Sequence, residues 1–133
     1  MGLQVKEIYV NLPVKDLEKS KGFFNSLGFE FHPEMTDEKA ACMIAGENIF
    51  VMLLTEPFFK TFTKKELTDA TRNTEVITAI SADSREAVDE MVNKALAAGG
   101  KASNDKMNDE YMYGWSFQDL DGHLWEVVYM EQS

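Results

Sequence analysis

Apolar and polar positions alternate along residues 7–14, which is typical of a strand with one buried face. A helical pattern follows from Asp16, a residue type that caps helix N-termini, to Leu27, and Gly28 can adopt the backbone conformation that ends it. Three further strands are predicted over residues 29–34, 40–45 and 48–54. The last of these is apolar on both faces, so we expect it at the centre of a sheet.

The same order of elements recurs in the second half of the chain. Residues 75–81 indicate a strand, and the acidic capping box "DSRE" at 83–86 begins a helix that Gly99 and Gly100 stop. Three more strands are predicted over residues 101–105, 111–117 and 124–130. Strand, helix and three strands therefore occur twice, which predicts an α+β fold made of two βαβββ modules.

One helix per module can cover only one face of its sheet, so the strand residues divide into two sets. The set expected to face the helices is Ile8, Val10, Leu12, Ile77, Ala79, Trp125 and Val127. The opposite set is Tyr9, Asn11, Val76, Thr78, Leu124, Glu126 and Val128. We expect this second set to line a cavity enclosed by a curved mixed sheet, with the helices on the outer face. Glu126 is then an acidic residue in the wall of that cavity.

The chain has 133 residues, 44% of them hydrophobic, which suits one compact domain and is too short for two independent ones. Within this single domain we expect a first module over 1–56, a connector over 57–73 and a second module over 74–133. The 13 basic and 23 acidic residues leave a formal net charge of −10. This charge disfavours nucleic acid and anionic membrane surfaces as partners, because both are bound by clustered Lys and Arg.

Three further features of the sequence bear on the cellular compartment in which the protein is expected. No apolar run approaches the ~20 residues of a membrane helix, and the longest, "IFVMLL" at 49–54, has the length of a strand. The first ten residues lack the basic segment followed by an apolar stretch that marks a secretory signal. Cys42 is the only cysteine, so it cannot form an internal disulfide and is expected to be a small buried hydrophobic residue. Together these features predict a cytoplasmic protein.

The connector is longer than an ordinary connection of ~4–6 residues, and it carries Phe58, Phe59 and Phe62 close together. Three phenylalanines in a polar segment are expected to bury against something. One interpretation is a lid that selects ligands by apolar shape, with Phe59 contacting the ligand. The other is a short amphipathic helix that patches the core, which Pro57 would suit as a first-turn residue.

Three segments of the chain resemble the vicinal oxygen chelate superfamily, which includes glyoxalase I, bleomycin-resistance proteins and extradiol dioxygenases. They are "LPVKDLEKSKGFFNSLGF" (12–29), "DSREAVDEMVNKALAAGG" (83–100) and "SFQDLDGHLWEVV" (116–128). With the doubled order of elements, the resemblance covers nearly the whole chain. It implies paired βαβββ modules and, because family members commonly pair their modules between two chains, a homodimer.

The resemblance also implies a site for a divalent metal with four protein ligands. The matching positions are Tyr9, Met52, Val76 and Glu126. Only Glu126 is a good ligand for a hard cation, because the other three offer a neutral phenol, a thioether and no donor. His32 and His123 do not occupy ligand positions. We therefore expect no metal and no other cofactor, unless Glu75 rather than Val76 faces inward and brings a second carboxylate.

The role of Glu126 stays open between a metal ligand, a general base, and a carboxylate held by a neighbouring donor such as Asn11 or the Tyr9 hydroxyl. The favoured hypothesis is a binding protein, similar to bleomycin-resistance members, that takes up a small organic molecule without a metal. Its expected ligand-binding residues are Tyr9, Asn11, Met52, Phe59, Val76, Thr78 and Trp115, with Glu126 as the catalytic candidate. The alternative is a metal-dependent lyase or isomerase that resembles lactoylglutathione lyase. A third possibility is an interaction partner with a vestigial pocket.

Overall fold

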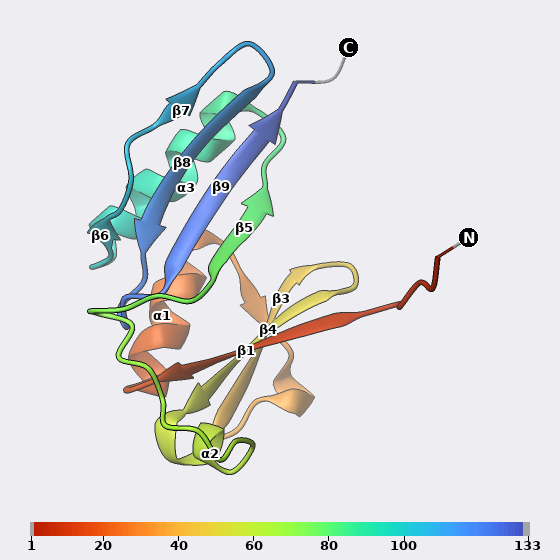
Figure 1. Ribbon diagram of the computed structural model, residues 1–133, viewed down its shortest axis with the longest axis vertical. Coiled ribbons are helices and arrows are strands. Elements are labelled where there is room, and N and C mark those ends of the chain that lie inside the picture. Colours follow the sequence, from red (N-terminus) through yellow and green to blue (C-terminus); the bar gives the residue numbers. More distant parts are fainter. Residues whose placement is uncertain (1, 132–133) are drawn as a thin grey trace. The chain divides into compact units, whose positions relative to one another are not determined.

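The structure is a computed structural model that describes residues 2–131. The chain forms two compact units, residues 1–67 and residues 68–133. Each unit contains its own mixed sheet, one of four strands and one of five, and a long helix that packs on that sheet (Figure 1). This arrangement confirms the predicted α+β fold, and it gives each βαβββ module a separate sheet.

The first unit contains β1 (Ile8–Val14), α1 (Leu17–Leu27), β2 (Glu30–Phe31), a short 3-10 helix (Pro33–Met35), β3 (Ala40–Gly46), β4 (Ile49–Thr55) and α2 (Glu56–Lys60). The strand order is β1-β4-β3-β2, with β1 parallel to β4 and the other pairs antiparallel. β4 has a neighbour on each side, as its two apolar faces predicted. β2 is shorter than the strand expected over 29–34, because Pro33 begins the 3-10 helix.

Helix α1 begins and ends at the predicted residues. The Asp16 carboxylate accepts a hydrogen bond from the Lys19 amide at 3.1 Å. Gly28 lies in the left-handed region with φ of 109°, which a side chain would disfavour. Between these caps the buried side chains of the helix, namely Leu17, Ser20, Phe23, Phe24 and Leu27, face the sheet. The first unit therefore has a core of its own between α1 and its strands.

The second unit contains β5 (Ile77–Ser81), α3 (Arg85–Ala97), β6 (Lys101–Ala102), β7 (Met107–Asn108), β8 (Met112–Gln118) and β9 (Leu124–Met130). The strand order is β5-β9-β8-β6, and the short strand β7, which no periodicity predicted, also pairs with β8. Helix α3 is capped by Ser84, whose hydroxyl accepts a hydrogen bond from the Ala87 amide at 3.0 Å. Val88, Val92 and Ala95 are its buried residues, and the helix packs on β8 and β9.

The register of β5 corrects the predicted assignment of faces. Thr78 lies beside Trp125, and Ala79 lies beside Glu126. Because residues that pair directly share a face, Thr78 points to the face that α3 covers, and Ile77 and Ala79 point to the Glu126 face. The prediction had these positions reversed, since a shift of one residue along a strand exchanges its two faces.

Trp115 also lies on the face that α3 covers. It pairs with Val127 on β9, and its neighbours along β8 in the same row are Tyr113 and Phe117. The Tyr113 hydroxyl donates a hydrogen bond to the Asp89 carboxylate of α3 at 2.6 Å, which identifies the helix side. The register therefore places the Trp115 side chain on the face opposite Glu126, although both residues border the same small hollow, and its role in ligand binding stays a prediction. The Lys106 ammonium lies 4.5 Å from the centre of the Trp115 ring.

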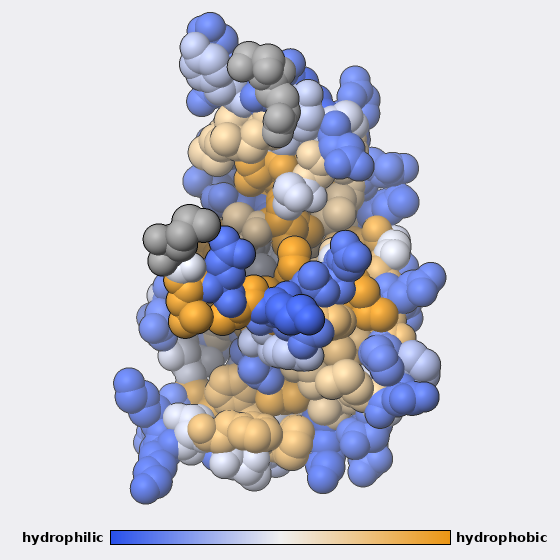
Figure 2. Space-filling view, turned by 90° about the vertical axis from the view of Figure 1, so that its right-hand side faces the viewer, coloured by the Kyte–Doolittle hydropathy of each residue, from blue (hydrophilic) through white to orange (hydrophobic). Residues whose placement is uncertain are grey.

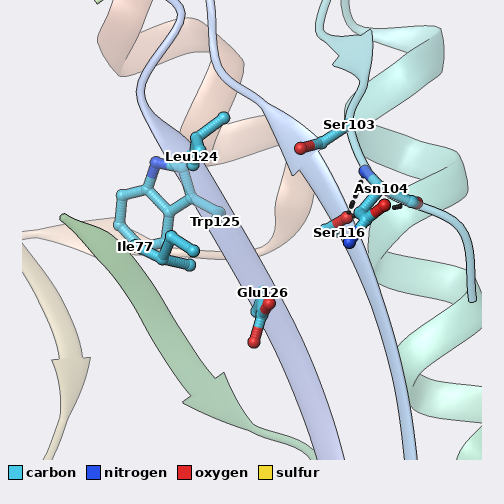
Figure 3. A pocket seen from close by; sticks show the side chains of 7 residues that line it. All are labelled: Ile77, Ser103, Asn104, Ser116, Leu124, Trp125 and Glu126. Carbon is cyan, nitrogen blue, oxygen red and sulfur yellow. Dashed lines mark hydrogen bonds between the residues drawn. The ribbon is translucent and has the colours of Figure 1, made fainter. Parts of the chain in front are cut away.

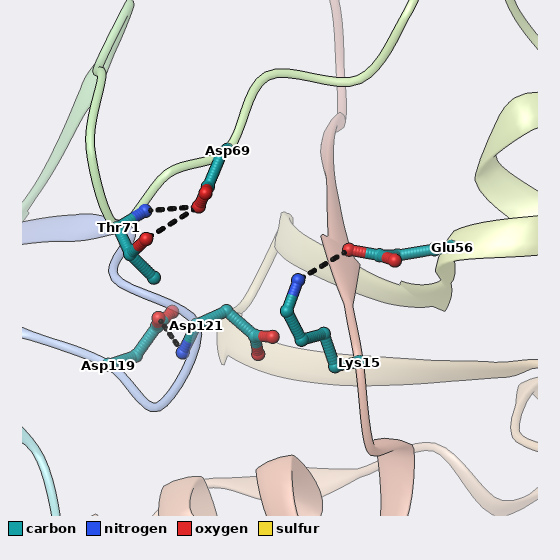
Figure 4. A network of polar contacts seen from close by, with 6 residues as sticks. All are labelled: Lys15, Glu56, Asp69, Thr71, Asp119 and Asp121. Atoms are coloured by element: carbon teal, nitrogen blue, oxygen red, sulfur yellow. Dashed lines mark hydrogen bonds and ion pairs between the residues drawn. The ribbon is translucent and has the colours of Figure 1, made fainter.

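A close backbone contact joins the end of the connector to the turn before β9. Gly122 has φ of 90°, and a Cβ atom added there would lie 2.8 Å from the Ala70 carbonyl oxygen. Asp69 shapes the connector at this point, because its carboxylate accepts hydrogen bonds from the amide of Thr71 at 3.0 Å and from its hydroxyl at 2.6 Å (Figure 4). Only glycine fits at position 122 without a shift of this backbone.

Hydrophilic and hydrophobic side chains are interspersed on the surface drawn in Figure 2. The exposed large hydrophobic residues include Ile8 and Ile49 in the first unit and Ile77 and Met130 in the second. Among residues 2–131, no helix has the length and hydrophobicity needed to cross a membrane.

Candidate functional site

A pocket of about 250 Å³ lies within the second unit, on the face of the sheet opposite α3. β5, β8, β9 and the segment after β6 contribute its lining residues, which are Ile77, Ser103, Asn104, Ser116, Leu124, Trp125 and Glu126 (Figure 3). Glu126 also borders a smaller adjoining hollow next to Met107 and Gly114. Glu126 therefore lines a pocket within this unit, and the cavity enclosed by both modules stays a prediction.

Glu126 is partly buried in the middle of β9, between Ala79 of β5 and Ser116 of β8. Within residues 2–131, its carboxylate makes no hydrogen bond or ion pair with another side chain or with the backbone. The lining residues of the pocket include no Lys, Arg or His. A partly desolvated carboxylate therefore faces the pocket with no protein cation in the pocket wall.

Two other polar residues of the pocket, Ser116 and Asn104, bond to one another. The Ser116 hydroxyl accepts a hydrogen bond from the backbone amide of Asn104 at 2.8 Å and donates one to the backbone carbonyl oxygen of Asn104 at 3.3 Å. The Asn104 side-chain oxygen accepts from the Asp105 amide at 3.1 Å. These bonds hold the segment after β6 against β8 (Figure 3). Ser116 and Asn104 therefore build the wall, and Glu126 is the acidic group that it presents.

The turn that leads into β9 is organised by a buried carboxylate. Asp119 is 4% exposed, and its oxygens accept hydrogen bonds from the amides of Asp121 and His123 and from the indole nitrogen of Trp125, each at 3.0 Å. Burial raises the pKa of the Asp119 carboxyl above its usual range, and the nearby His123 and these hydrogen bonds oppose the rise. Asp119 thereby orients Trp125, whose neighbours in the chain, Leu124 and Glu126, line the pocket.

No role for Asp119 was predicted, although it lies in the quoted motif "SFQDLDGHLWEVV". The available signal is an Asp two residues before an Asp-Gly turn, since Asp side chains commonly bond to backbone amides two residues further on. His123 lies next to this turn, as expected, and not beside Glu126.

Three of the predicted ligand-binding residues share one face of the first unit's sheet. Met52 pairs with Asn11, and Tyr9 pairs with Phe50 in the same parallel ladder. Tyr9 is 44% exposed, and its ring stacks on the Phe50 ring at 5.0 Å between centroids. Its hydroxyl donates to the Glu7 carboxylate at 2.8 Å, a bond that raises the pKa of Tyr9. The side-chain amide of Asn11 donates a hydrogen bond to the backbone carbonyl oxygen of Tyr9 at 3.5 Å.

The connector starts as the short helix α2, which packs on β1 and β4. The ion pair between Lys15, just after β1, and Glu56, the first residue of α2, measures 3.3 Å (Figure 4). Phe59 is partly buried in α2, whereas Phe62 is 69% exposed beyond the helix and meets the Phe58 ring edge-on at 5.1 Å. The interpretation of a helix that patches the core describes this part of the connector, and the lid stays a prediction.

The two units repeat one register, and this repeat locates the metal-ligand position on β5. Met52 pairs with Asn11, two residues after Tyr9, and Glu126 pairs with Ala79, two residues after Ile77. The position equivalent to Tyr9 is therefore Ile77 and not Val76. Val76 lies before β5, is 56% exposed, and its carbonyl oxygen accepts from the Thr74 hydroxyl at 3.0 Å.

The residues at these positions do not fit the metal that the resemblance implies. In the first unit they offer a phenol already bonded to Glu7 and the Met52 thioether. In the second they offer the aliphatic Ile77 and one carboxylate, and Zn²⁺ or a hard divalent cation needs several His, carboxylate or other oxygen ligands. Among the described residues, no three His, Cys, Asp or Glu side chains lie together in a way that could hold a metal ion.

Comparison with known proteins gives one family match, to the model described as bleomycin resistance protein-like N-terminal, over residues 6–46. No curated protein matches the chain. A solved structure of a hypothetical protein from S. aureus is 31% identical, with a TM-score of 0.79, and the match covers 95% of this chain and 95% of that one.

Two other solved structures share the fold at lower identity. One is a glyoxalase/bleomycin resistance protein/dioxygenase family enzyme from Burkholderia phytofirmans, which is 17% identical over 92% of this chain and 96% of that one, with a TM-score of 0.75. The other is the fosfomycin resistance protein FosX from Listeria monocytogenes, complexed with Mn(II) and sulfate. It is 19% identical over 99% of this chain and 90% of that one, with a TM-score of 0.66.

Proposed function

Because this chain belongs to the glyoxalase/bleomycin resistance/dioxygenase family of the vicinal oxygen chelate superfamily, we propose that it binds a small organic molecule in the pocket beside Glu126. The observation that carries the proposal is a carboxylate without a protein partner in a pocket of about 250 Å³. Glu126 contributes the polar contact, and Ile77 and Leu124 contribute apolar surface. We propose that the binding needs no resident metal, because Ile77 and Ala79 leave Glu126 without a second ligand on β5.

A lyase or isomerase in which Glu126 moves a proton is the second candidate. The cations and hydrogen-bond donors that such a reaction needs are not favoured by the residues of the pocket wall. Such a reaction needs an electrophile to stabilise the charge that develops on the substrate, commonly a metal or strong hydrogen-bond donors. The lining residues include no cation, the Ser116 hydroxyl is already bonded to Asn104, and the Ser103 hydroxyl and the Asn104 side-chain nitrogen are neutral donors. The binding function requires neither group.

The assembly that we propose is a homodimer. Its support is the family resemblance, since family members commonly pair their modules between two chains, and such an assembly would cover exposed hydrophobic side chains such as Ile49 and Met130. Sedimentation velocity measures the assembly directly. A monomer at all working concentrations would refute this part of the proposal and leave the pocket unaffected.

The binding function is tested by a thermal-shift screen of small organic compounds, with hits measured by calorimetry. The matched variants are Ile77→Trp, which fills the pocket from an exposed position, and Val76→Trp, which adds the same side chain at the exposed neighbour outside the pocket. We expect hits to bind the native chain and Val76→Trp and to lose binding in Ile77→Trp. Hits that bind all three chains equally, or a screen without hits, would refute the proposal.

The enzyme alternative is tested by elemental analysis and by turnover of glutathione hemithioacetals with and without Ni²⁺, Zn²⁺ or Mn²⁺. We expect no stoichiometric metal and no metal-dependent turnover. One bound metal ion per chain, together with turnover that is lost in Glu126→Gln, would instead establish the lyase.

A further inference from the structure

We propose that the ligand of this pocket carries a protonated amine that pairs with Glu126 and an apolar body that lies against Ile77 and Leu124. This inference rests on the proposed binding function and adds the chemical class of the ligand. It makes Glu126 a residue that determines specificity, and it requires no proton transfer.

The first argument concerns charge. Glu126 is partly buried, and within residues 2–131 its carboxylate has neither an ion-pair partner nor a hydrogen-bond donor. The pocket lining contains no Lys, Arg or His that could supply a positive charge. Burial of a carboxylate is favourable only when it is paired or hydrogen-bonded, and a bond to a charged donor is about twice as strong as a neutral one. The ligand is therefore the available source of the missing cation.

The second argument concerns the remaining polar groups. Ser116 is buried, and its hydroxyl both accepts from and donates to the Asn104 backbone. The Asn104 side-chain oxygen is occupied by the Asp105 amide. A ligand that is held mainly by acceptor groups would rely on the Ser103 hydroxyl and the Asn104 side-chain nitrogen, which are neutral donors and form weaker bonds than a charged pair does. A ligand with a donor group can bond directly to the Glu126 carboxylate, which is an acceptor.

The third argument concerns spacing. Ile77 and Leu124 pair side by side, and Ala79 and Glu126 form the pair two residues further along the same face. Two residues of a strand span roughly 7 Å. The apolar surface therefore begins at about that distance from the carboxylate, which corresponds to an amine joined to an aliphatic or aromatic group by a short alkyl chain. A pocket of about 250 Å³ also restricts the ligand to a small molecule, because pockets for drug-sized ligands measure ~300–1,000 Å³.

The experiment compares three probes of similar size and different charge: 2-phenylethylamine, 2-phenylethanol and 3-phenylpropanoate. Dissociation constants at neutral pH are measured by NMR titration of the ¹⁵N-labelled full chain. We expect the amine to bind at least about tenfold more tightly than the alcohol, and the carboxylate to bind most weakly. The shifted amides should include those of Ile77, Leu124 and Glu126.

Two variants with the same change in net charge separate the local contact from the overall charge of −10. Glu126→Gln keeps the shape of the side chain and should bring the amine and the alcohol to nearly equal affinity. Glu110→Gln alters an exposed residue outside the pocket and should keep the full preference for the amine. Amide spectra of both variants report whether the fold is retained.

The outcomes distinguish this inference from the proposed function. If the amine and the alcohol bind the native chain equally, or if Glu126→Gln keeps the preference for the amine, the inference that the ligand carries an amine is refuted. The pocket then remains a binding site. The inference is also refuted if none of the three probes binds at millimolar concentrations while other compounds bind the native chain and lose binding in Ile77→Trp. If no compound loses binding in Ile77→Trp, both the inference and the proposed function are refuted.

Discussion

The indole nitrogen of Trp125 donates a hydrogen bond to the buried carboxylate of Asp119 at 3.0 Å, across the turn that precedes β9. The Trp125 side chain is completely buried, and its ring stacks on that of Phe117 with 6.2 Å between centroids. This bond fixes the start of β9 relative to the core, and Glu126 is the next residue along the strand. The position of the candidate site therefore depends on a polar contact beneath the sheet.

Replacing Asp119 with Ala is expected to lower the free energy of unfolding by about 1–3 kcal/mol, because it leaves the buried Trp125 nitrogen and two turn amides without their acceptor. Urea denaturation followed by tryptophan fluorescence measures the change. Asp105→Ala, at an exposed carboxylate, is the control and should have little effect. A native-like stability of Asp119→Ala would show that the turn holds without this residue.

The raised pKa of Asp119 predicts a pH dependence of stability with a definite sign. The folded state holds the proton more tightly than the unfolded state, so acidification favours the folded state. This contribution is complete below the unfolded pKa of ~3.9, and it is lost as the pH rises through the higher folded pKa. Relative to Asp119→Asn, the native chain should gain stability as the pH is lowered through that window. Urea titrations of both chains test the difference, and parallel curves would contradict the shift.

Gly122→Ala is expected to destabilise the chain, because the added Cβ would meet the Ala70 backbone at 2.8 Å and the φ of 90° disfavours a side chain. A loss of about 1–3 kcal/mol is typical of such backbone strain. Gly22→Ala is the matched control. Gly22 lies inside α1 with open space around its Cβ position, so alanine there should stabilise the chain by ~0.5–1 kcal/mol. Thermal unfolding of both variants should show opposite shifts.

The hydrogen bond from Tyr9 to Glu7 predicts the titration of the phenol. Because the Glu7 carboxylate stabilises the protonated hydroxyl, Glu7→Gln should lower the pKa of Tyr9 towards its ordinary value. Tyrosine side-chain carbon NMR resolves the titration of each ring. Glu110→Gln, at an exposed carboxylate elsewhere in the chain, is the control and should leave the pKa of Tyr9 unchanged.

The register of β5 predicts that neighbouring substitutions differ in their effect on ligand binding. Ile77→Ala removes apolar surface from the pocket and should weaken a hit several-fold, since each buried methylene contributes ~0.8 kcal/mol. Thr78→Val changes the face that α3 covers and should leave the affinity unchanged. Calorimetry with one hit compares the two. The reverse order of effects would support the sequence-based assignment of faces over the observed one.

The local signals in the chain were sufficient for the long strands and for the two long helices, α1 and α3. Asp16 and Gly28 mark the ends of α1, because capping is a contact between residues a few positions apart. The extra strand β7 was not predictable in this way, since two residues carry no periodicity. It forms because Met107 and Asn108 meet β8, a partner that the local sequence does not specify.

For the candidate site, the sequence determined that Glu126 is an acidic residue on a half-apolar strand and that few of the family's metal ligands remain. Tertiary structure decided which residues surround it. In the structure Ile77 and Ala79, rather than Val76 and Thr78, lie on the Glu126 face, because the face of a strand depends on its register with the neighbouring strand, which is β9 here. The bonds from Asp119 to Trp125 and from Ser116 to Asn104 likewise join separate parts of the chain, so only the folded chain could reveal them.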